Sequence, residues 1–284
     1  MANLPPPTVA PAGWYPDPLG GGAPRYFDGR EWAPPEPPGP SLSPPTPPHP
    51  SLPVAAGAGA LVILLVSLVG GRLLLSWLSR YDWPILAYVV VLTVIGYGPS
   101  VWWCRATSRR WATGSMASDI GLRFRWSDAG WGPLVWMGGV ATQLACAAIV
   151  IGLDVPISNN TDGIGEVDAS RGYVIAVLVS AVVAAPVVEE MVFRGVVLRS
   201  LLSRLGPAVT IAVQGVLFGA AHVDPERGSG NVGLVLVLTG VGVAFGTAAF
   251  LFRRIGPTIV AHGIFNAVVL AIVLSGVADT ASVA

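Results

Sequence analysis

Two adjacent carboxylates and an arginine stand inside a long apolar run, in the segment PVVEEMVFRG at residues 186–195. A charged side chain at the centre of a bilayer costs about 2.5–3.5 kcal/mol on insertion scales, so such residues usually have a function. In a helix, Glu190 and Arg194 are four residues apart with the acid first, a spacing that favours a side-chain pair. Glu189 is rotated by about 100° from Glu190 and has no arginine four residues later. The pattern predicts a structural pair, Glu190–Arg194, and one unpaired carboxylate, Glu189, which is a candidate general base.

Two of the three histidines also lie in or at the end of apolar runs. His222 closes the stretch LFGAAH, and His262 lies in VAHGIFN, where Asn266 follows four residues later on the same helix face. A glutamate, two histidines and an asparagine on three apolar segments would each carry a desolvation penalty if they were dispersed. We therefore expect Glu189, His222, His262 and Asn266 to converge on one polar site.

The composition indicates that these segments cross a membrane. Only 11% of the residues are charged, 53% are hydrophobic and the mean hydropathy is +0.66, whereas soluble domains carry about 25% charged residues. The formal net charge is zero, so we expect no nucleic-acid partner. The expected fold class is an all-α, polytopic membrane helix bundle in the lipid bilayer with about seven spans. The spans are predicted at residues 54–79, 84–104, 131–153, 172–190, 207–222, 231–252 and 256–277.

Loop charges predict the orientation of the bundle in the plasma membrane. Seven of the sixteen arginines gather in loops on one side, which we expect to be cytoplasmic together with the N-terminus, and the acidic loop 154–170 is expected outside. Arg72 and Arg80 do not fit this scheme, because they fall on the outer side. The arginines on the expected cytoplasmic side are Arg105, Arg109, Arg110, Arg123, Arg125, Arg253 and Arg254.

This orientation raises a difficulty for the proposed convergence. His222 ends a span that runs outward, whereas His262 lies about 9 Å inside the opposite face at 1.5 Å per residue. The two histidines can meet only if a span boundary shifts or a segment is re-entrant. We expect that the predicted span boundaries are wrong around residues 190–222, and that residues 191–205 lie in the membrane at an angle.

The first 53 residues differ from the rest, since they contain 18 of the 26 prolines and no apolar run. In residues 1–34, aromatic residues alternate with turn signals, which predicts a small hairpin module held by its rings. Residues 35–53 are predicted to be an extended, disordered linker, and residues 54–284 the helix bundle. The aromatic residues are Trp14, Tyr15, Tyr26, Phe27 and Trp32. The stretch GWYPDP…RYFDG…W resembles a short domain of unknown function found in many actinobacterial membrane proteins, which implies a tether or a binding site for a protein partner.

Three motifs occur in order in the second half of the chain: EEMVFR as EExxxR, FGAAH as FxxxH and HGIFN as HxxxN. Together they resemble the CAAX protease and bacteriocin-processing (CPBP, or Abi) family of intramembrane endopeptidases. The resemblance implies a protease core at about residues 172–272 that hydrolyses peptide bonds of a membrane-associated protein or peptide. Carried across, the catalytic residues are Glu189, His222, His262 and Asn266, and the supporting residues are Glu190 and Arg194.

The resemblance leaves two mechanisms open. In the first, Glu189 and His222 polarise a water molecule while His262 and Asn266 stabilise the oxyanion. In the second, Glu189, His222 and His262 hold a zinc ion that activates the water, as in a metalloprotease. We favour the mechanism without a metal cofactor, because the Asn266 amide is a poor zinc ligand and has the donor that an oxyanion site needs.

Two functions other than proteolysis also fit a polar site in a membrane bundle. One is a catalytically silent membrane scaffold or immunity protein, and the other is a proton-coupled transporter that uses Glu189 and the histidines as a relay. Motifs of other intramembrane proteases do not support a different protease class. The sequence contains no HExxH, and its nearest matches to GxSG and GxGD, RGSG and GIGE, depart from these motifs.

Overall fold

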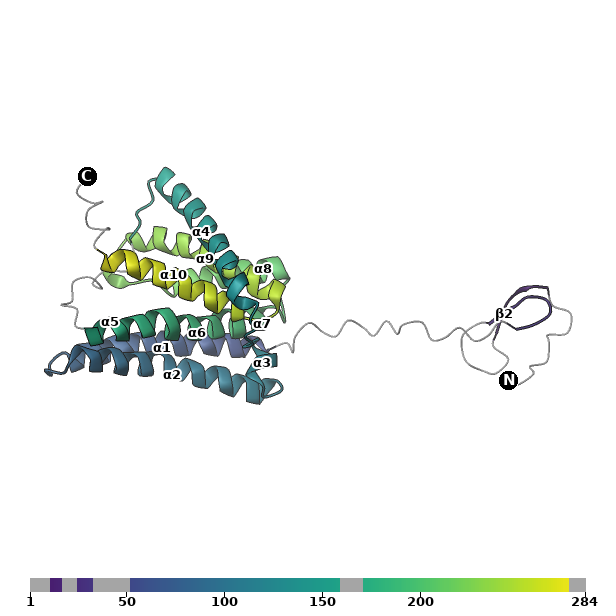
Figure 1. Cartoon of the computed structure of the whole chain (residues 1–284), viewed down its shortest axis with the longest axis horizontal. Helices are drawn as coiled ribbons and strands as arrows, with labels where there is room; N and C mark the ends of the chain where they lie inside the picture. The colour runs from purple at the N-terminus through teal and green to yellow at the C-terminus, as the bar shows by residue number, and fades with distance from the viewer. Residues whose placement is uncertain (1–10, 17–24, 33–51, 159–170, 276–284) are drawn as a thin grey trace. The chain divides into compact units, whose positions relative to one another are not determined.

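The computed structural model describes residues 11–16, 25–32, 52–158 and 171–275 (Figure 1). The chain divides into two units, Met1–Pro48 and His49–Ala284. The described strands lie in the first unit and the described helices in the second. The predicted linker at 35–53 lies outside the described residues, except for its last two positions.

The first unit contains a two-stranded antiparallel hairpin. Its strands are β1 (Gly13–Tyr15) and β2 (Arg25–Phe27). The rings of Trp14 and Tyr26 meet edge to face across the strands with centroids 5.5 Å apart, and Phe27 packs on Trp32 at 5.3 Å. Phe27 is only 3% exposed and forms the small core of the module with Trp32, whereas Trp14 and Tyr26 are 67% and 38% exposed. The predicted aromatic hairpin is confirmed.

Within the described residues, six helices are long and apolar enough to cross a membrane. They are α1 (Val54–Leu78), α2 (Ile85–Trp111), α4 (Asp128–Gly152), the composite helix from α5 to α7, α9 (Gly230–Phe252) and α10 (Gly256–Leu274). Short helices α3 (Met116–Asp119) and η3 (Pro225–Arg227) lie in connections. The membrane helix bundle predicted from the apolar runs is confirmed.

The stretch predicted as a span at 207–222 is a shorter helix, α8 (Pro207–Ala220). Its 14 residues measure about 21 Å at 1.5 Å per residue, which is less than the roughly 30 Å of a bilayer's hydrocarbon core. Proline in its first turn is favourable, because the missing amide proton would have no partner inside the helix. α8 packs along α9, where a Cβ atom on Gly242 would lie 2.8 Å from the Cα of Gly215. Glycine therefore permits this close helix contact.

The span that carries the two carboxylates is a composite helix. It consists of α5 (Arg171–Leu178), η1 (Val179–Ala184), α6 (Ala185–Glu190), η2 (Met191–Val197) and α7 (Leu198–Leu201), of which η1 and η2 are π-helical. The helix assumed for the Glu190–Arg194 spacing is thus present, and residues 191–201 continue it beyond the predicted span end at 190, with π-helical turns that the sequence did not predict. π-helical turns inside α-helices frequently occur at functional sites.

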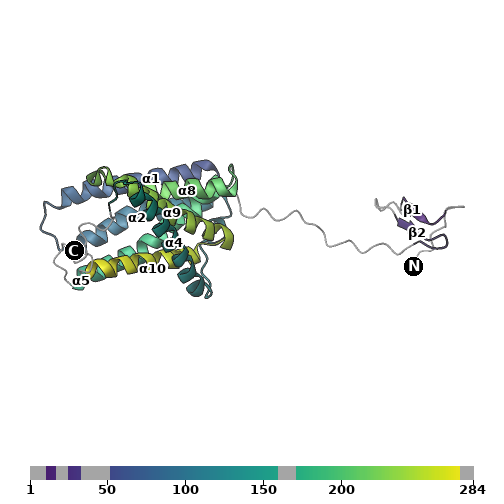
Figure 2. The same cartoon turned by 90° about the horizontal axis from the view of Figure 1, so that it is seen from above.

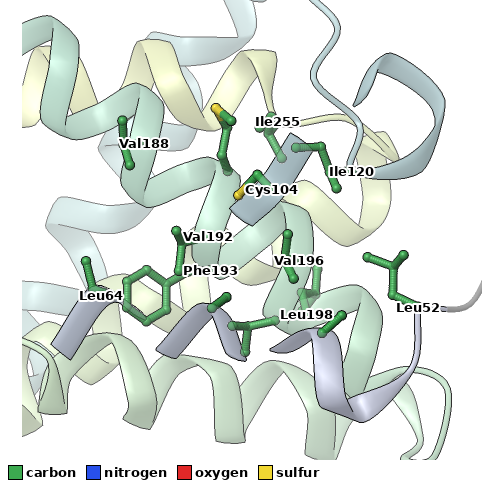
Figure 3. Packing of buried hydrophobic residues seen from close by; sticks show 14 of the residues in the cluster. Leu52, Leu64, Cys104, Ile120, Val188, Val192, Phe193, Val196, Leu198 and Ile255 are labelled. Atoms are coloured by element: carbon green, nitrogen blue, oxygen red, sulfur yellow. The ribbon is translucent and has the colours of Figure 1, made fainter. Parts of the chain in front are cut away.

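Buried side chains connect the composite helix to the first two spans. Val192, Phe193 and Val196 are fully buried and belong to one cluster with Leu64 of α1 and Cys104 of α2 (Figure 3). Figures 1 and 2 show α1, α2 and the composite helix side by side, with α4 crossing α9. The residues of η2 thus form part of the main core as well as the turn that presents the charged residues.

The arginine-rich connections meet at one end of the bundle. Arg199, near the end of the composite helix, donates hydrogen bonds to the carbonyls of Asp119 and Arg253 at 3.4 and 3.3 Å. Arg254 forms an ion pair with Asp128 at 2.6 Å. The loops after α2 and between α9 and α10 therefore share one face of the membrane domain. The assignment of this face to the cytoplasm stays a prediction from the loop charges.

Candidate active site

The adjacent carboxylates lie at the junction of α6 and η2. Glu190 is completely buried, whereas the Glu189 side chain is 17% exposed. Both follow the π-helical η1 and precede the π-helical η2, so each carboxylate is presented between two turns of non-standard pitch. The two side chains leave the helix in different directions, and they have different partners.

Glu190 is the centre of a buried charged network. Its Oε1 atom accepts a hydrogen bond from Nη1 of Arg194 at 2.8 Å and lies 3.0 Å from Nδ1 of His262. The side chains of Glu190 and Arg194 have no exposed surface. A buried charge without a partner is strongly destabilising, so each member of this pair depends on the other. The spacing argument and the structure agree on this contact.

The hydrogen bond to Glu190 determines which nitrogen of a neutral His262 ring carries the proton. If neutral His262 donates its Nδ1 proton to the carboxylate, Nε2 carries the lone pair. That Nε2 atom lies 3.8 Å from Oε2 of Glu189. Oε2 of Glu189 is buried and has no hydrogen-bond partner among the described residues. A single water molecule at about 2.8 Å from each atom would fit between them.

His222 follows the end of α8, and its Nδ1 donates a hydrogen bond to the carbonyl of Phe218 at 2.8 Å. The two histidines lie close enough to contact the same side chain, which the predicted spans did not allow. The centroid of the Phe218 ring lies 4.9 Å from that of His222 and 5.9 Å from that of His262. The predicted separation assumed that residues 207–222 cross the whole bilayer, whereas α8, with 14 residues, is too short to do so. Both imidazole rings therefore contact one phenyl ring.

The sequence indicated neither the contacts of Phe218 with Arg194 and both histidines nor any part of Phe245 in the site. The guanidinium carbon of Arg194 lies 4.3 Å from the Phe218 ring centroid and 5.4 Å from that of Phe245. Phe245 is fully buried, and its ring centroid is 6.0 Å from that of His262. Cation–π contacts of this kind stabilise a buried guanidinium. Phe218 stands in the FxxxH motif but reads as simple packing, and no spacing signal distinguishes Phe245.

Asn266 lies one turn after His262 on α10 and is held by the composite helix. Its Nδ2 donates a hydrogen bond of 2.8 Å to the carbonyl of Ala181, in the π-helical turn η1. This bond ties α10 to the helix that carries Glu189. One amide proton of Asn266 is used in this way, and a primary amide has a second.

The loop that follows His222 is anchored to α1. Asp224 forms an ion pair with Arg72. The Asn231 side chain accepts a hydrogen bond from the backbone N–H of Asp224 at 2.9 Å and donates one to the carbonyl of Asp224 at 2.7 Å. Arg227 donates to the carbonyl of His222 at 3.4 Å. The hydrogen bond from Arg72 lowers the pKa of the Asp224 carboxyl below its ordinary value. Arg72, which did not fit the predicted orientation, therefore has a specific carboxylate partner.

A zinc ion held by Glu189, His222 and His262 is the alternative that the sequence left open. Across the described ranges, no group of three His, Cys, Asp or Glu side chains is arranged to hold a metal ion. Glu189, His222 and His262 as placed here do not form such a group.

An apolar cavity of about 340 Å³ lies between the two helices that carry the site. Val182, Val183 and Val187 line it from η1 and α6, and aliphatic residues of α10 such as Ile259 and Ile264 line it from the other side. Val187 is two residues before Glu189, and the cavity continues past Gly263, next to His262. The cavity therefore lies between the helices that carry Glu189 and His262, although none of the four candidate catalytic residues lines it.

Comparisons with known proteins agree with the motifs. Residues 171–268 match the model of the family described as "Type II CAAX prenyl endopeptidase Rce1-like". The chain is also 25% identical over 191 residues to "Putative membrane peptidase YdiL" of Bacillus subtilis (strain 168), covering 66% of this chain and 70% of that protein. No solved structure matches the chain. Residues 171–268 are therefore similar to a family of membrane-bound prenyl endopeptidases, and the chain as a whole is similar to a membrane peptidase.

Proposed function

We propose that this chain is an intramembrane endopeptidase in which Glu189 and His262 activate a water molecule for hydrolysis of a peptide bond in a membrane-associated protein or peptide. The observation that carries the proposal is the 3.8 Å distance between Oε2 of Glu189 and Nε2 of His262. Both atoms can act as acceptors, so together they can bind the two protons of one water molecule. Its oxygen lone pairs would then be directed away from both side chains, toward a substrate carbonyl.

The chemistry follows from these positions. Glu189 removes a proton from the water as the water oxygen bonds to the carbonyl carbon, and the carbonyl electron pair moves onto its oxygen. The same proton then passes to the amide nitrogen, the C–N bond breaks, and a carboxylic acid and an amine leave. His262 orients the water, and Glu190 with Arg194 positions the His262 ring. Because His262 lies close to Glu189, we assign to His262 the water-orienting role that the sequence analysis gave to His222.

His222 and Asn266 are proposed to stabilise the oxyanion. Because Nδ1 of His222 bonds to a backbone carbonyl, its Nε2 is the nitrogen left for the substrate, and it donates when the ring is protonated. The second amide proton of Asn266 is a further donor. Each donor of this kind contributes about 10²–10³ in kcat in enzymes with an oxyanion site.

The apolar cavity beside the site supports a substrate that reaches it from the membrane. Its walls come from η1, α6 and α10, the elements around Glu189 and His262. We propose that an aliphatic part of the substrate packs there and brings the scissile bond to the water. The walls contain no charged side chain, which is consistent with a peptide segment buried in the bilayer.

The test is a comparison of protein termini in membranes from cells that produce the wild type or Glu189→Gln. The expected result is a set of cleaved termini that disappears in the variant while the protein level and thermal unfolding stay the same. Asp82→Asn, which removes an exposed carboxylate between α1 and α2, is the matched control and should leave the termini unchanged. Wild-type cleavage by Glu189→Gln would refute the proposal. Uptake that depends on membrane potential, without cleavage, would favour the transporter, and neither activity would favour the scaffold.

A further inference from the structure

We propose that a pocket at the arginine-rich end of α2 binds the headgroup of an anionic phospholipid. The cavity has a volume of about 670 Å³ and is lined mainly by three tryptophans and three arginines of the last turns of this helix. They are Trp102, Trp103, Trp111, Arg105, Arg109 and Arg110. The pocket lies apart from the residues of the proposed active site, and the inference does not depend on the proposed function.

The charge of the pocket requires an anionic ligand. Its lining contains no Asp or Glu. Arg109 and Arg110 are exposed, and neither forms an ion pair with any residue that the structure describes. Arg105 donates a hydrogen bond to the carbonyl of Gly114 at 3.0 Å, which directs its side chain along the pocket end of the helix. Guanidinium groups bind phosphate oxygens through paired hydrogen bonds, so this cluster suits a phosphodiester.

The tryptophans require that the ligand also have an apolar part. Trp103 is fixed, because its indole nitrogen donates to the carbonyl of Ala56 at 2.9 Å, and its ring centroid lies 5.9 Å from that of Trp111. Trp102, 64% exposed, stands beside it at 6.2 Å. A free phosphate ion has no apolar part that could pack against the exposed faces of these rings. The glycerol and first acyl carbons of a phospholipid would cover them, at the depth where tryptophan is enriched in membrane proteins.

A second group of residues at the same end of the bundle allows a comparison between this pocket and ordinary interfacial charge. Arg123, Phe124, Arg125 and Trp126 combine arginines with exposed aromatic rings, but they do not line the cavity. General attraction of arginine to anionic lipid would act on both groups alike. Lipid binding at a specific site would instead depend only on the arginines of α2. The two groups therefore provide a matched pair of variants.

The experiment measures lipid retained by the purified full-length chain in detergent, by native mass spectrometry, after incubation with phosphatidylglycerol or phosphatidylcholine. We expect the wild type to retain phosphatidylglycerol in preference to phosphatidylcholine. Arg109→Gln/Arg110→Gln should reduce the retained phosphatidylglycerol by about ten-fold, and Arg123→Gln/Arg125→Gln by about two-fold or less. Equal losses in the two variants, or no preference in the wild type, would overturn the proposal.

A second measurement does not depend on the folding of the arginine variants. Brominated phosphatidylglycerol should quench tryptophan fluorescence of the wild type more than brominated phosphatidylcholine does, and Trp102→Phe should reduce that difference. Inorganic phosphate at millimolar concentration should not displace the lipid. Displacement by phosphate alone would show a simple anion site, and equal quenching by both lipids would show no headgroup selection; either result would refute a phospholipid site.

Discussion

The Nε2 atom of His262 lies 3.8 Å from Oε2 of Glu189. The other nitrogen of the same ring lies 3.0 Å from Glu190, which also holds Arg194. One imidazole thus connects two consecutive carboxylates that have different environments. Glu190 is internal and paired, whereas Glu189 has a buried oxygen without a hydrogen-bond partner among the described residues. The Glu189 carboxylate is therefore suited to catalysis, and the Glu190 carboxylate to a structural role.

The buried pair can be tested by a double-mutant cycle. Glu190→Gln leaves Arg194 buried without its counter-charge, so the free energy of unfolding should fall by about 3–5 kcal/mol. Adding Arg194→Met removes the uncompensated charge, and the double variant should be more stable than Glu190→Gln alone. Chemical unfolding in detergent measures both. If the losses of the two single variants simply add, the residues do not stabilise each other.

Phe218 should matter more for activity than for stability. Phe218→Leu keeps a buried apolar side chain but removes the ring that contacts both histidines. We expect kcat to fall by about ten-fold or more, since small displacements of catalytic groups are costly, and the free energy of unfolding by about 1 kcal/mol. Phe250→Leu, at a half-buried phenylalanine at the edge of the main core, is the control and should leave kcat unchanged. Equal effects on kcat would show that Phe218 is only packing.

The anchor between Arg72 and Asp224 predicts a pH dependence. The hydrogen bond from Arg72 lowers the pKa of Asp224, so the charged carboxylate stabilises the fold at neutral pH. This stabilisation is present above the unfolded pKa of about 3.9 and is lost as the pH falls through the lower folded pKa.

Asp224→Asn should therefore be less stable than the wild type at pH 7, and the difference should shrink below about pH 4. Thermal unfolding across this range checks the expectation. Asp154→Asn, at an exposed aspartate in another connection, should show no such difference. A stability gap for Asp224→Asn that is unchanged at low pH would mean that the charge of Asp224 is not what anchors the loop.

The metal-free mechanism predicts that a chelator does not inhibit the enzyme. Purified protein treated with a strong zinc chelator and then dialysed should keep its peptidase rate within about two-fold. Magnesium and calcium are added back in the control to separate zinc removal from effects on the lipid. Loss of activity that zinc alone restores would replace the proposed mechanism with the zinc-dependent alternative.

Much of the architecture followed from local sequence patterns. Apolar runs longer than the bilayer core predict spans, because a helix that satisfies its own backbone hydrogen bonds is the stable form in lipid. The alternating aromatic residues around Tyr26 predicted the hairpin, and the four-residue spacing predicted the Glu190–Arg194 contact. These features depend on residues close together in the chain.

Other features could not be predicted in this way. The end of α8 after Ala220 and the π-helical turns around Glu189 and Glu190 arise where a helix meets its neighbours. An amide normally bonds to the carbonyl four residues back, and the rarer bond to the carbonyl five residues back forms where contacts with neighbouring helices favour it. The bond from Asn266 to a carbonyl of η1 likewise needs two helices in contact.

The sequence alone determined that this chain is a membrane helix bundle with a rare set of polar residues at fixed spacings along its helices. The tertiary structure decided which of those residues meet: His262 lies between Glu189 and Glu190, and His222 reaches the same site by contact with Phe218. The reason is physical. Helical periodicity sets the direction of a side chain around its own axis, but the depth and rotation of each helix against the others are set by packing.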